Sequence, residues 1–247
     1  LDEPRRAKQE IGYLPEQPPV YRDLTVDEYL YYCARLNRVA RGRIGRAMDR
    51  ARERCGLGDV RRRLIGNLSK GYQQRVGIAQ AILHTPAVVI LDEPTVGLDP
   101  IQILEIRRLI RELGEDHGII LSTHILPEVQ STCNQVQIIH QGQLVFADSM
   151  TGLEQRLQAT SLVAAFHATP DSDALGQLPG VTSVEMLDDG RARIHYTGTD
   201  PSEALVELAV SREWRLHELS PDRRTLEQIF IELTCAEAPA NEPGEAA

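Results

Sequence analysis

The 247 residues can bury one large core or two smaller ones, and a hydrophobic content of 42% with 26% charged residues is typical of globular proteins. No apolar stretch approaches the roughly 18 residues that span a bilayer, and the first residues contain no hydrophobic signal region. A net charge of -9 disfavours nonspecific nucleic-acid binding, and the four cysteines lack the CxxC spacing of zinc sites.

The first third of the chain predicts a helical unit over residues 24–66. Thr25 is followed three residues later by Glu28, which is the spacing of a capping box, so a helix should begin near Val26. An arginine-rich segment from Arg35 to Arg63 continues as amphipathic helix. No aromatic residue is interleaved with the arginines beyond Arg38, so a solvated helical face is favoured over a nucleic-acid surface.

Strands and helices alternate after a further helix that is predicted from Gly71. Strands are expected at 87–91, 119–122 and 135–140, with helices at 101–113 and 126–133 between them. Nearly continuous apolar strands separated by helices indicate a parallel sheet that is covered on both faces.

The order of the elements changes beyond Met150. Strand, helix, strand, strand, helix and strand follow one another at 162–167, 173–178, 181–187, 191–196, 202–212 and 215–219. This order predicts a small α+β domain of the ferredoxin-like type. A final helix at 225–233 precedes a segment rich in Pro, Glu and Ala, residues 236–247, which predicts a disordered tail.

Two adjacent acids, Asp92 and Glu93, stand directly after the apolar run 87–91. Acids at the end of a core strand are costly to desolvate unless they face a cation or a reacting water. We therefore expect a site at the carboxyl edge of the sheet, although both acids could instead cap the following turn. Asp92 is suited to hold Mg²⁺ through its water shell.

A second candidate site is the start of the helix after Ser69 and Gly71. A hydroxyl, unpaired backbone N–H groups and the positive end of a helix form a natural anion site. Gly71 would let a phosphate approach closely. The same residues are also compatible with an ordinary Ser-capped helix.

Four short motifs follow one another in a fixed order: "LSKGYQQR" at 68–75, "VVILDEP" at 88–94, "GLDP" at 97–100 and "STH" at 122–124. The ordered set resembles the nucleotide-binding subunit of ATP-binding cassette (ABC) transporters, over residues 10 to about 147. With its extra C-terminal domain and the ending "LEQIFIELT", the chain is also similar to the ATPase subunits of ABC-2-type exporters.

The resemblance implies a P-loop NTPase-like α/β fold for residues 1–150, an accessory domain over 151–235, and ATP and Mg²⁺ as ligands. In this family, the residue matching Glu93 polarises the attacking water, and the one matching His124 contacts the γ-phosphate. Ser69 and Gly71 would contact ATP held by the opposite subunit.

Two further residues receive roles from the resemblance. Asp99 matches a loop acid that links the two sites across the dimer, although it is equally compatible with a helix cap. Glu16 stands where the family usually has a Gln that senses Mg²⁺ and the transporter partner, and Gln17 lies beside it.

The implied partners are a transmembrane permease and a second ATPase subunit, in a homodimer or heterodimer, and no nucleic acid. The implied location is the cytoplasmic face of the cell membrane. Two alternatives remain open: a noncatalytic or degenerate ABC subunit that serves as an interaction module, and a nucleic-acid-associated ABC ATPase.

The phosphate-binding loop Gly-x-x-x-x-Gly-Lys-Ser/Thr does not occur in the sequence. The two lysines, Lys8 and Lys70, follow Ala and Ser, so no Gly-Lys pair exists. We expect that the chain is incomplete at its N-terminus and that it is inactive by itself.

Overall fold

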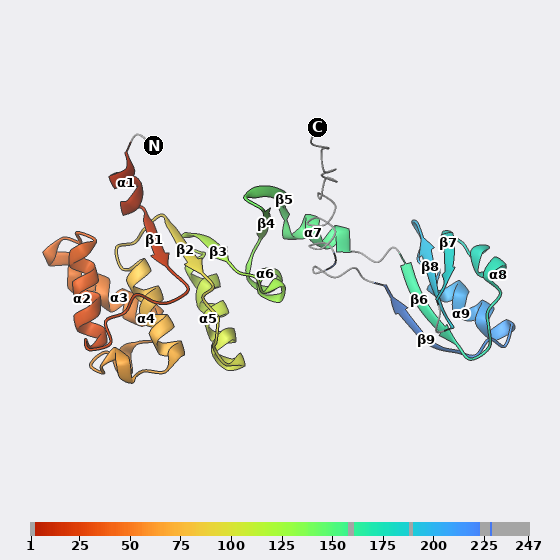
Figure 1. The fold of residues 1–247 in the computed structure, drawn as a ribbon, viewed down its shortest axis with the longest axis horizontal. Coiled ribbons are helices and arrows are strands. Elements are labelled where there is room, and N and C mark those ends of the chain that lie inside the picture. Colours follow the sequence, from red (N-terminus) through yellow and green to blue (C-terminus); the bar gives the residue numbers. More distant parts are fainter. Residues whose placement is uncertain (1–2, 158–160, 188–189, 223–227, 229–247) are drawn as a thin grey trace, which may run out of the picture. The chain divides into compact units, whose positions relative to one another are not determined.

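The computed structural model describes residues 3–157, 161–187, 190–222 and 228, and the chain divides into two compact units, 1–133 and 134–247 (Figure 1). Among the described residues, no helix is long and apolar enough to cross a membrane.

The N-terminal unit is built on a parallel sheet of three strands in the order β1-β2-β3, with bounds Ile11–Leu14, Val88–Asp92 and Gly118–Ser122. Leu14 pairs with Leu91, and Asp92 pairs with Ser122, so the carboxyl ends of all three strands lie at one edge. The predicted strands β2 and β3 are confirmed. The four-residue β1 was not predicted, because it is short and directly precedes a Pro-rich loop.

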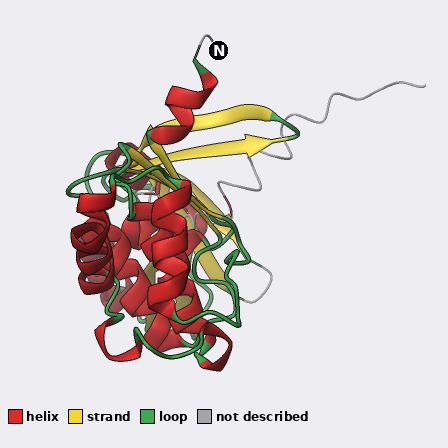
Figure 2. Ribbon diagram, turned by 90° about the vertical axis from the view of Figure 1, so that its left-hand side faces the viewer, coloured by secondary structure: helices red, strands yellow, loops and turns green. Residues whose placement is uncertain are grey.

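The helices of this unit are α1 (Pro4–Gln9), α2 (Val26–Leu36), α3 (Ile44–Arg54), α4 (Lys70–Ile82), α5 (Pro100–Leu113) and α6 (Leu126–Thr132), with short 3₁₀ turns at Arg41–Arg43, Gly58–Val60 and Ile65–Asn67. The helix predicted near Val26 is confirmed, and its capping box is formed: the hydroxyl of Thr25 accepts from the N–H of Glu28, whose carboxylate accepts from the N–H of Thr25. Helices α2, α3 and α4 pack against one another (Figure 1). Figure 2 shows the red helices of this unit from the left-hand side of that view.

Helix α4 lies directly on β1. A Cβ atom at Gly12 would come closer than 3.0 Å to the carbonyl oxygen of Ala81, and one at Gly77 would meet the side chain of Leu14. Two glycines therefore allow helix and strand to approach so closely.

Among the residues that the structure describes, only one face of the parallel sheet is buried. Leu14, Val89 and Leu91 are fully buried on that face, whereas Tyr13 and Ile120 on the other are 50% and 55% exposed. The prediction that the sheet is covered on both faces is wrong for the described residues. The apolar strands suggested two buried faces, because an apolar run does not reveal which of its alternating side chains are covered.

The predicted solvated face is confirmed for eight of the eleven arginines from Arg35 to Arg63, which are exposed, whereas Arg52 and Arg54 are partly buried. Arg52 forms ion pairs with Asp27 and Asp49, and its side chain is only 13% exposed. Arg54 forms an ion pair with Asp116 and donates to the carbonyl of Glu112. The prediction of a solvated face is therefore wrong for Arg52, because Asp27 on α2 and Asp49 on its own helix α3 neutralise its charge.

The C-terminal unit begins with an antiparallel hairpin of β4 (Gln135–His140) and β5 (Gln143–Ser149), followed by α7 (Met150–Leu157). The predicted strand 135–140 exists, but it does not belong to the parallel sheet. Gln141 and Gly142 both have positive φ, as a two-residue type I′ turn requires. This turn brings β5 back beside β4, a signal that the sequence analysis missed.

A four-stranded antiparallel sheet follows, with the strand order β7-β8-β6-β9. Its elements are β6 (Ser161–Phe166), α8 (Ser172–Gly176), β7 (Val181–Met186), β8 (Arg191–Tyr196), α9 (Ser202–Ser211) and β9 (Leu216–Pro221). The predicted succession of strands and helices is therefore present. Phe166, Leu175, Ile194, Leu205 and Trp214 are among the residues of its own hydrophobic core. The helix predicted at 225–233 and the tail 236–247 lie outside the described residues.

Candidate functional site

The carboxyl edge of the parallel sheet gathers three of the predicted site residues. Glu16 lies two residues beyond β1, Asp92 is the last residue of β2, and His124 lies two residues beyond β3. Because the strands are parallel and in register, segments far apart in the sequence end at the same edge.

Glu93 and His124 are in direct contact. The Oε1 atom of Glu93 accepts a hydrogen bond from the backbone N–H of His124 at 3.1 Å and lies 2.7 Å from its Nδ1. Glu93 is largely buried, with 18% of its side chain exposed, whereas the imidazole of His124 is 74% exposed. The exposed imidazole is available to a ligand, while the carboxylate beneath it is sheltered.

The carboxylate of Glu93 perturbs His124. The hydrogen bond with Glu93 and then its charge raise the pKa of His124 above the ordinary value, and the charges of Glu128 and Glu16 act in the same direction. A raised pKa favours the imidazolium form, which is suited to an anionic ligand.

The two oxygens of Glu93 have different environments. Oε1 is engaged by His124, whereas Oε2 is buried and has no hydrogen-bond partner among the described residues. An unsatisfied buried carboxylate oxygen is costly, so it marks a place where a water or a ligand group would be stabilised.

The backbone of Glu93 is unusual as well. Its φ is +46°, a left-handed conformation that is strained for a residue with a Cβ and that occurs preferentially at functional sites. The N–H of Glu93 donates to the carbonyl of Ser122 at 2.9 Å, which ties the strained residue to β3. Its side chain thus turns toward His124 instead of capping the turn that follows.

Asp92 and Glu16 are the candidate ligands of Mg²⁺. Among the described residues, no group of three or more His, Cys, Asp or Glu side chains is arranged around one point. Mg²⁺ keeps several waters and often takes only one or two protein carboxylates, so one strand-end Asp is compatible with it. Glu16 lies close enough for its charge to act on His124.

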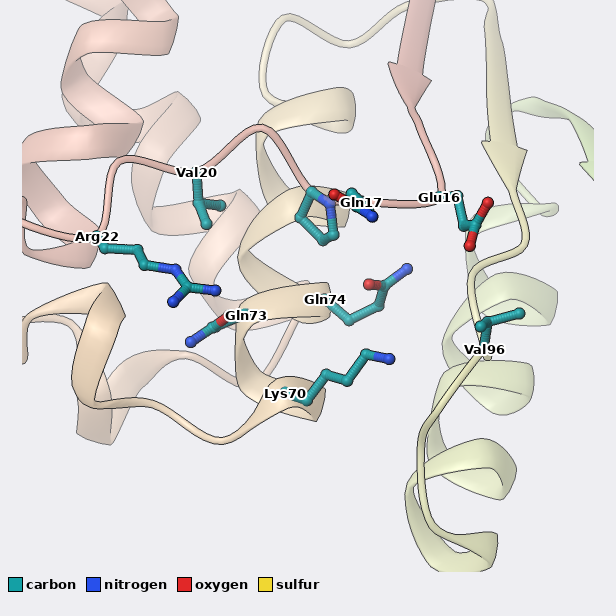
Figure 3. Close-up of a pocket in the computed structure, with 9 residues that line it drawn as sticks. Glu16, Gln17, Val20, Arg22, Lys70, Gln73, Gln74 and Val96 are labelled. Atoms are coloured by element: carbon teal, nitrogen blue, oxygen red, sulfur yellow. The ribbon is translucent and has the colours of Figure 1, made fainter.

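Glu16 also lines a cavity of ≈ 520 Å³ (Figure 3). The cavity lies between the loop after β1, the start of α4 and the loop after β2. Its other lining residues are Gln17, Pro18, Val20, Arg22, Lys70, Gln73, Gln74 and Val96. Both Glu16 and Gln17 face this space, so the loop presents a carboxylate and an amide together.

Ser69 caps α4 as predicted. Its hydroxyl accepts from the N–H of Tyr72 at 3.4 Å. Gly71 is buried, and a Cβ atom there would lie 2.7 Å from the side-chain amide of Gln102 on α5. The space beside Gly71 that the sequence analysis assigned to a phosphate is therefore taken by Gln102 in this structure.

Asp99 is the N-cap of α5. Its carboxylate accepts from the N–H groups of Ile101 and Gln102, each at 3.0 Å, and Pro100 occupies the first helical position. The helix-cap interpretation thus applies within one subunit, and a role across a dimer would come in addition to it.

A buried polar cluster behind this edge was not predicted from the sequence. Glu128 is fully buried and contacts Thr95, Thr123 and Arg107. A sequence signal existed, because Thr95 follows "DEP" directly and Thr123 directly precedes His124. The partner four residues after His124 was not recognisable without the fold.

Comparisons with known proteins identify relatives of this chain. The family model described as "ABC transporter" matches residues 2–96. The uncharacterized ABC transporter ATP-binding protein YdbJ of Bacillus subtilis is 33% identical over 234 residues, which cover 94% of this chain and 73% of that protein. The bacitracin transport ATP-binding protein BcrA of Bacillus licheniformis is 33% identical over 90% of this chain and 72% of its own length.

Among solved structures, cbiO1 from Clostridium perfringens, described as part of the ABC transporter complex cbiONQ, is similar with a TM-score of 0.55 and 27% identity. The similarity covers 60% of each chain. The ordered motifs, the strand-end acids with their histidine, and these relatives lead to one conclusion: the chain belongs to the family of ABC transporter ATP-binding proteins.

Proposed function

We propose that this protein binds and hydrolyses ATP as a subunit of an ABC-2-type exporter, in a dimer that sandwiches two ATP molecules and drives a separate membrane permease. The observation that carries the proposal is the Glu93 and His124 pair, with one carboxylate oxygen engaged by the histidine and the other buried without a partner. This asymmetry is what a general base with a positioned neighbour requires.

In the proposed mechanism, Oε2 of Glu93 takes the proton of the attacking water. His124 keeps Oε1 oriented and offers its exposed imidazolium to the transferred phosphoryl group. Asp92 and Glu16 would hold Mg²⁺ through its waters, and the bound ion would offset phosphate charge. Ser69, Gly71 and Asp99 would act on the nucleotide of the opposite subunit, once Gln102 moves away from Gly71.

The domain assignments belong to the same proposal. We assign residues 1–150 to the ATPase domain and 151–235 to an accessory domain that regulates or dimerises. The strand order β7-β8-β6-β9 with two intervening helices supports a ferredoxin-like classification of the accessory domain. The subunit would act at the cytoplasmic face of the membrane, beside its permease.

The missing Gly-Lys-Ser/Thr loop limits what the 247 residues can do by themselves. Triphosphate charge is normally offset by the backbone N–H groups and the Lys of such a loop. We therefore propose that the isolated 247-residue chain binds ATP poorly and hydrolyses none. The same absence favours a noncatalytic subunit as the second candidate, against which the intact Asp92, Glu93 and His124 argue.

The test is Glu93→Gln in the protein expressed from its complete open reading frame. The amide keeps the shape of the carboxylate but is no base, so phosphate release should stop while ATP-dependent dimers accumulate in size-exclusion chromatography. Glu115→Gln, at an exposed position after α5, is the matched control and should leave turnover unchanged. Wild-type turnover in the Glu93→Gln variant would refute the role of Glu93.

A further inference from the structure

The carboxylate of Glu128, on α6, is completely buried, although it belongs to none of the motifs that define the site. A buried carboxylate is destabilising unless hydrogen bonds and an opposite charge compensate its lost hydration. Its surroundings therefore show what the buried group is used for.

One oxygen of Glu128 joins two loops. Oε2 accepts from the hydroxyl of Thr123 at 2.8 Å and from the hydroxyl of Thr95 at 3.2 Å. Thr123 immediately precedes His124, and Thr95 follows Glu93 by two residues. The same oxygen thus holds the loop after β2 and the loop after β3.

The other oxygen faces a cation. Oε1 lies 3.7 Å from Nε of Arg107 on α5, whose side chain is mostly buried. Neither of these two atoms has a hydrogen-bond partner among the described residues. Arg107 thus compensates the charge of Glu128, whereas the two threonines supply its hydrogen bonds.

Thr123 holds His124 from both sides. Its hydroxyl accepts from the N–H of Ile125 at 3.1 Å and, with its own proton, donates to Glu128. The residues before and after His124 are therefore tied to one hydroxyl, and that hydroxyl is tied to Glu128. This arrangement orients the N–H of His124 toward Glu93.

Glu93 gains a similar support from Thr95. The left-handed backbone of Glu93 persists only if the neighbouring structure prevents its relaxation. Thr95 is almost completely buried, and its hydrogen bond to Glu128 fixes the chain two residues further on. Strain at Glu93 and the anchor at Thr95 thus belong to one turn.

We propose that Glu128 is a positioning residue, which clamps the loops of Glu93 and His124 together and so maintains the geometry of this pair. The inference rests on the proposed ATPase function for its consequence, because misplacement of a catalytic pair by about 1 Å can cost a hundredfold in rate. The clamp itself is a matter of structure and can be measured without ATP.

Two pairs of variants test the clamp. Glu128→Leu removes the acceptor at similar volume, whereas Glu128→Gln keeps an oxygen for the two threonines. Thr95→Val removes one hydroxyl at nearly the same shape, whereas Thr95→Ser keeps it. We avoid Thr123→Val, because it would also remove the hydrogen bond from Ile125.

The first readout is the solvent-exchange rate of the His124 and Ile125 amides by NMR, with Val89 and Leu91 of the buried strand β2 as internal references. We expect Glu128→Leu and Thr95→Val to accelerate exchange at His124 and Ile125 about tenfold or more, without an effect on the references. The Gln and Ser variants should stay close to the wild type. Unchanged exchange, or equal acceleration of all four amides, would overturn the proposal.

The second readout is ATP turnover by the protein from the complete reading frame. Glu128→Leu and Thr95→Val should lower kcat about 10- to 100-fold and leave the KM for ATP within about threefold. Wild-type kcat in both variants would overturn the proposal while the ATPase function stands. If the wild type itself hydrolyses no ATP, the proposed function fails, and the exchange rates alone decide whether the clamp exists.

Discussion

At the scale of the residue, the two side chains that form the site's central contact lie in different environments. Glu93 is sheltered and strained, and His124 is exposed, yet they share a hydrogen bond. The shelter limits access of bulk solvent to the carboxylate, and the exposure leaves the imidazole accessible to a ligand. The roles proposed for Glu93 as a general base and for His124 as its orienting partner would use this division of environments.

Glu93→Gln should lower the pKa of His124 toward its ordinary value, because the hydrogen bond to a carboxylate and its charge are the largest causes of the upward shift. A raised folded-state pKa adds stability below the unfolded value of about 6.5, and this contribution is lost as the pH rises through the folded-state pKa. The stability difference between wild type and variant should therefore shrink in that window.

NMR titration of the imidazole C–H signals measures the pKa of His124, with His124→Gln as the assignment control. Urea unfolding at a series of pH values follows the stability. An unaltered pKa in the Glu93→Gln variant would show that the 2.7 Å contact does not persist in solution.

At the scale of the element, glycine positions decide how closely α4 approaches its neighbours. Gly12 on β1 faces the backbone carbonyl of Ala81, which cannot move without displacing the helix. Gly71 at the start of α4 faces the end of the flexible Gln102 side chain. The sequence does not distinguish these two glycines. They differ in the atoms that surround each of them in the fold.

Gly12→Ala and Gly71→Ala should therefore differ in stability. Gly12→Ala forces backbone movement and should lower the free energy of unfolding by about 2–3 kcal/mol. Gly71→Ala should stay within about 1 kcal/mol of the wild type, because Gln102 can yield and alanine favours the helix. Urea unfolding monitored by circular dichroism measures both, and equal losses would contradict the close approach of α4 to β1.

At the scale of the whole molecule, the four-stranded antiparallel sheet has a hydrophobic cluster of its own. All members of the cluster lie between Ala164 and Leu219. Trp214 packs edge-on against Phe166 with ring centroids 5.9 Å apart. A core that is complete within one stretch of chain indicates a unit that can fold by itself.

Residues 161–235 should thus fold when expressed alone. A dispersed amide spectrum by NMR is the expected result, and Trp214→Ala should remove the dispersion, because loss of a buried Trp costs about 3–5 kcal/mol. A collapsed spectrum of the unmodified fragment would refute this domain boundary.

Local structure was predictable where the interacting groups are neighbours in the sequence. The capping box of Thr25 and Glu28 and the caps at Ser69 and Asp99 follow from side chains that reach N–H groups two or three residues away. The apolar run before Asp92 likewise predicted β2 and the place of the acids at its end.

Pairings across the fold were not predictable in this way. The hairpin partner of β4, the exposed face of the parallel sheet and the presence of Gln102 beside Gly71 depend on which segments lie side by side. Periodicity describes one segment at a time, so it cannot select among partners.

By itself, the sequence determined the order of the motifs, and with it the family and the residues expected to meet ATP, because these are properties of one continuous stretch of chain. Only the tertiary structure decided that Glu93 contacts His124, 31 residues away, and that Glu128 joins the loops of both. The physical reason is the parallel sheet: its register brings the ends of distant strands to one edge, where short hydrogen bonds depend on positions that no local pattern specifies.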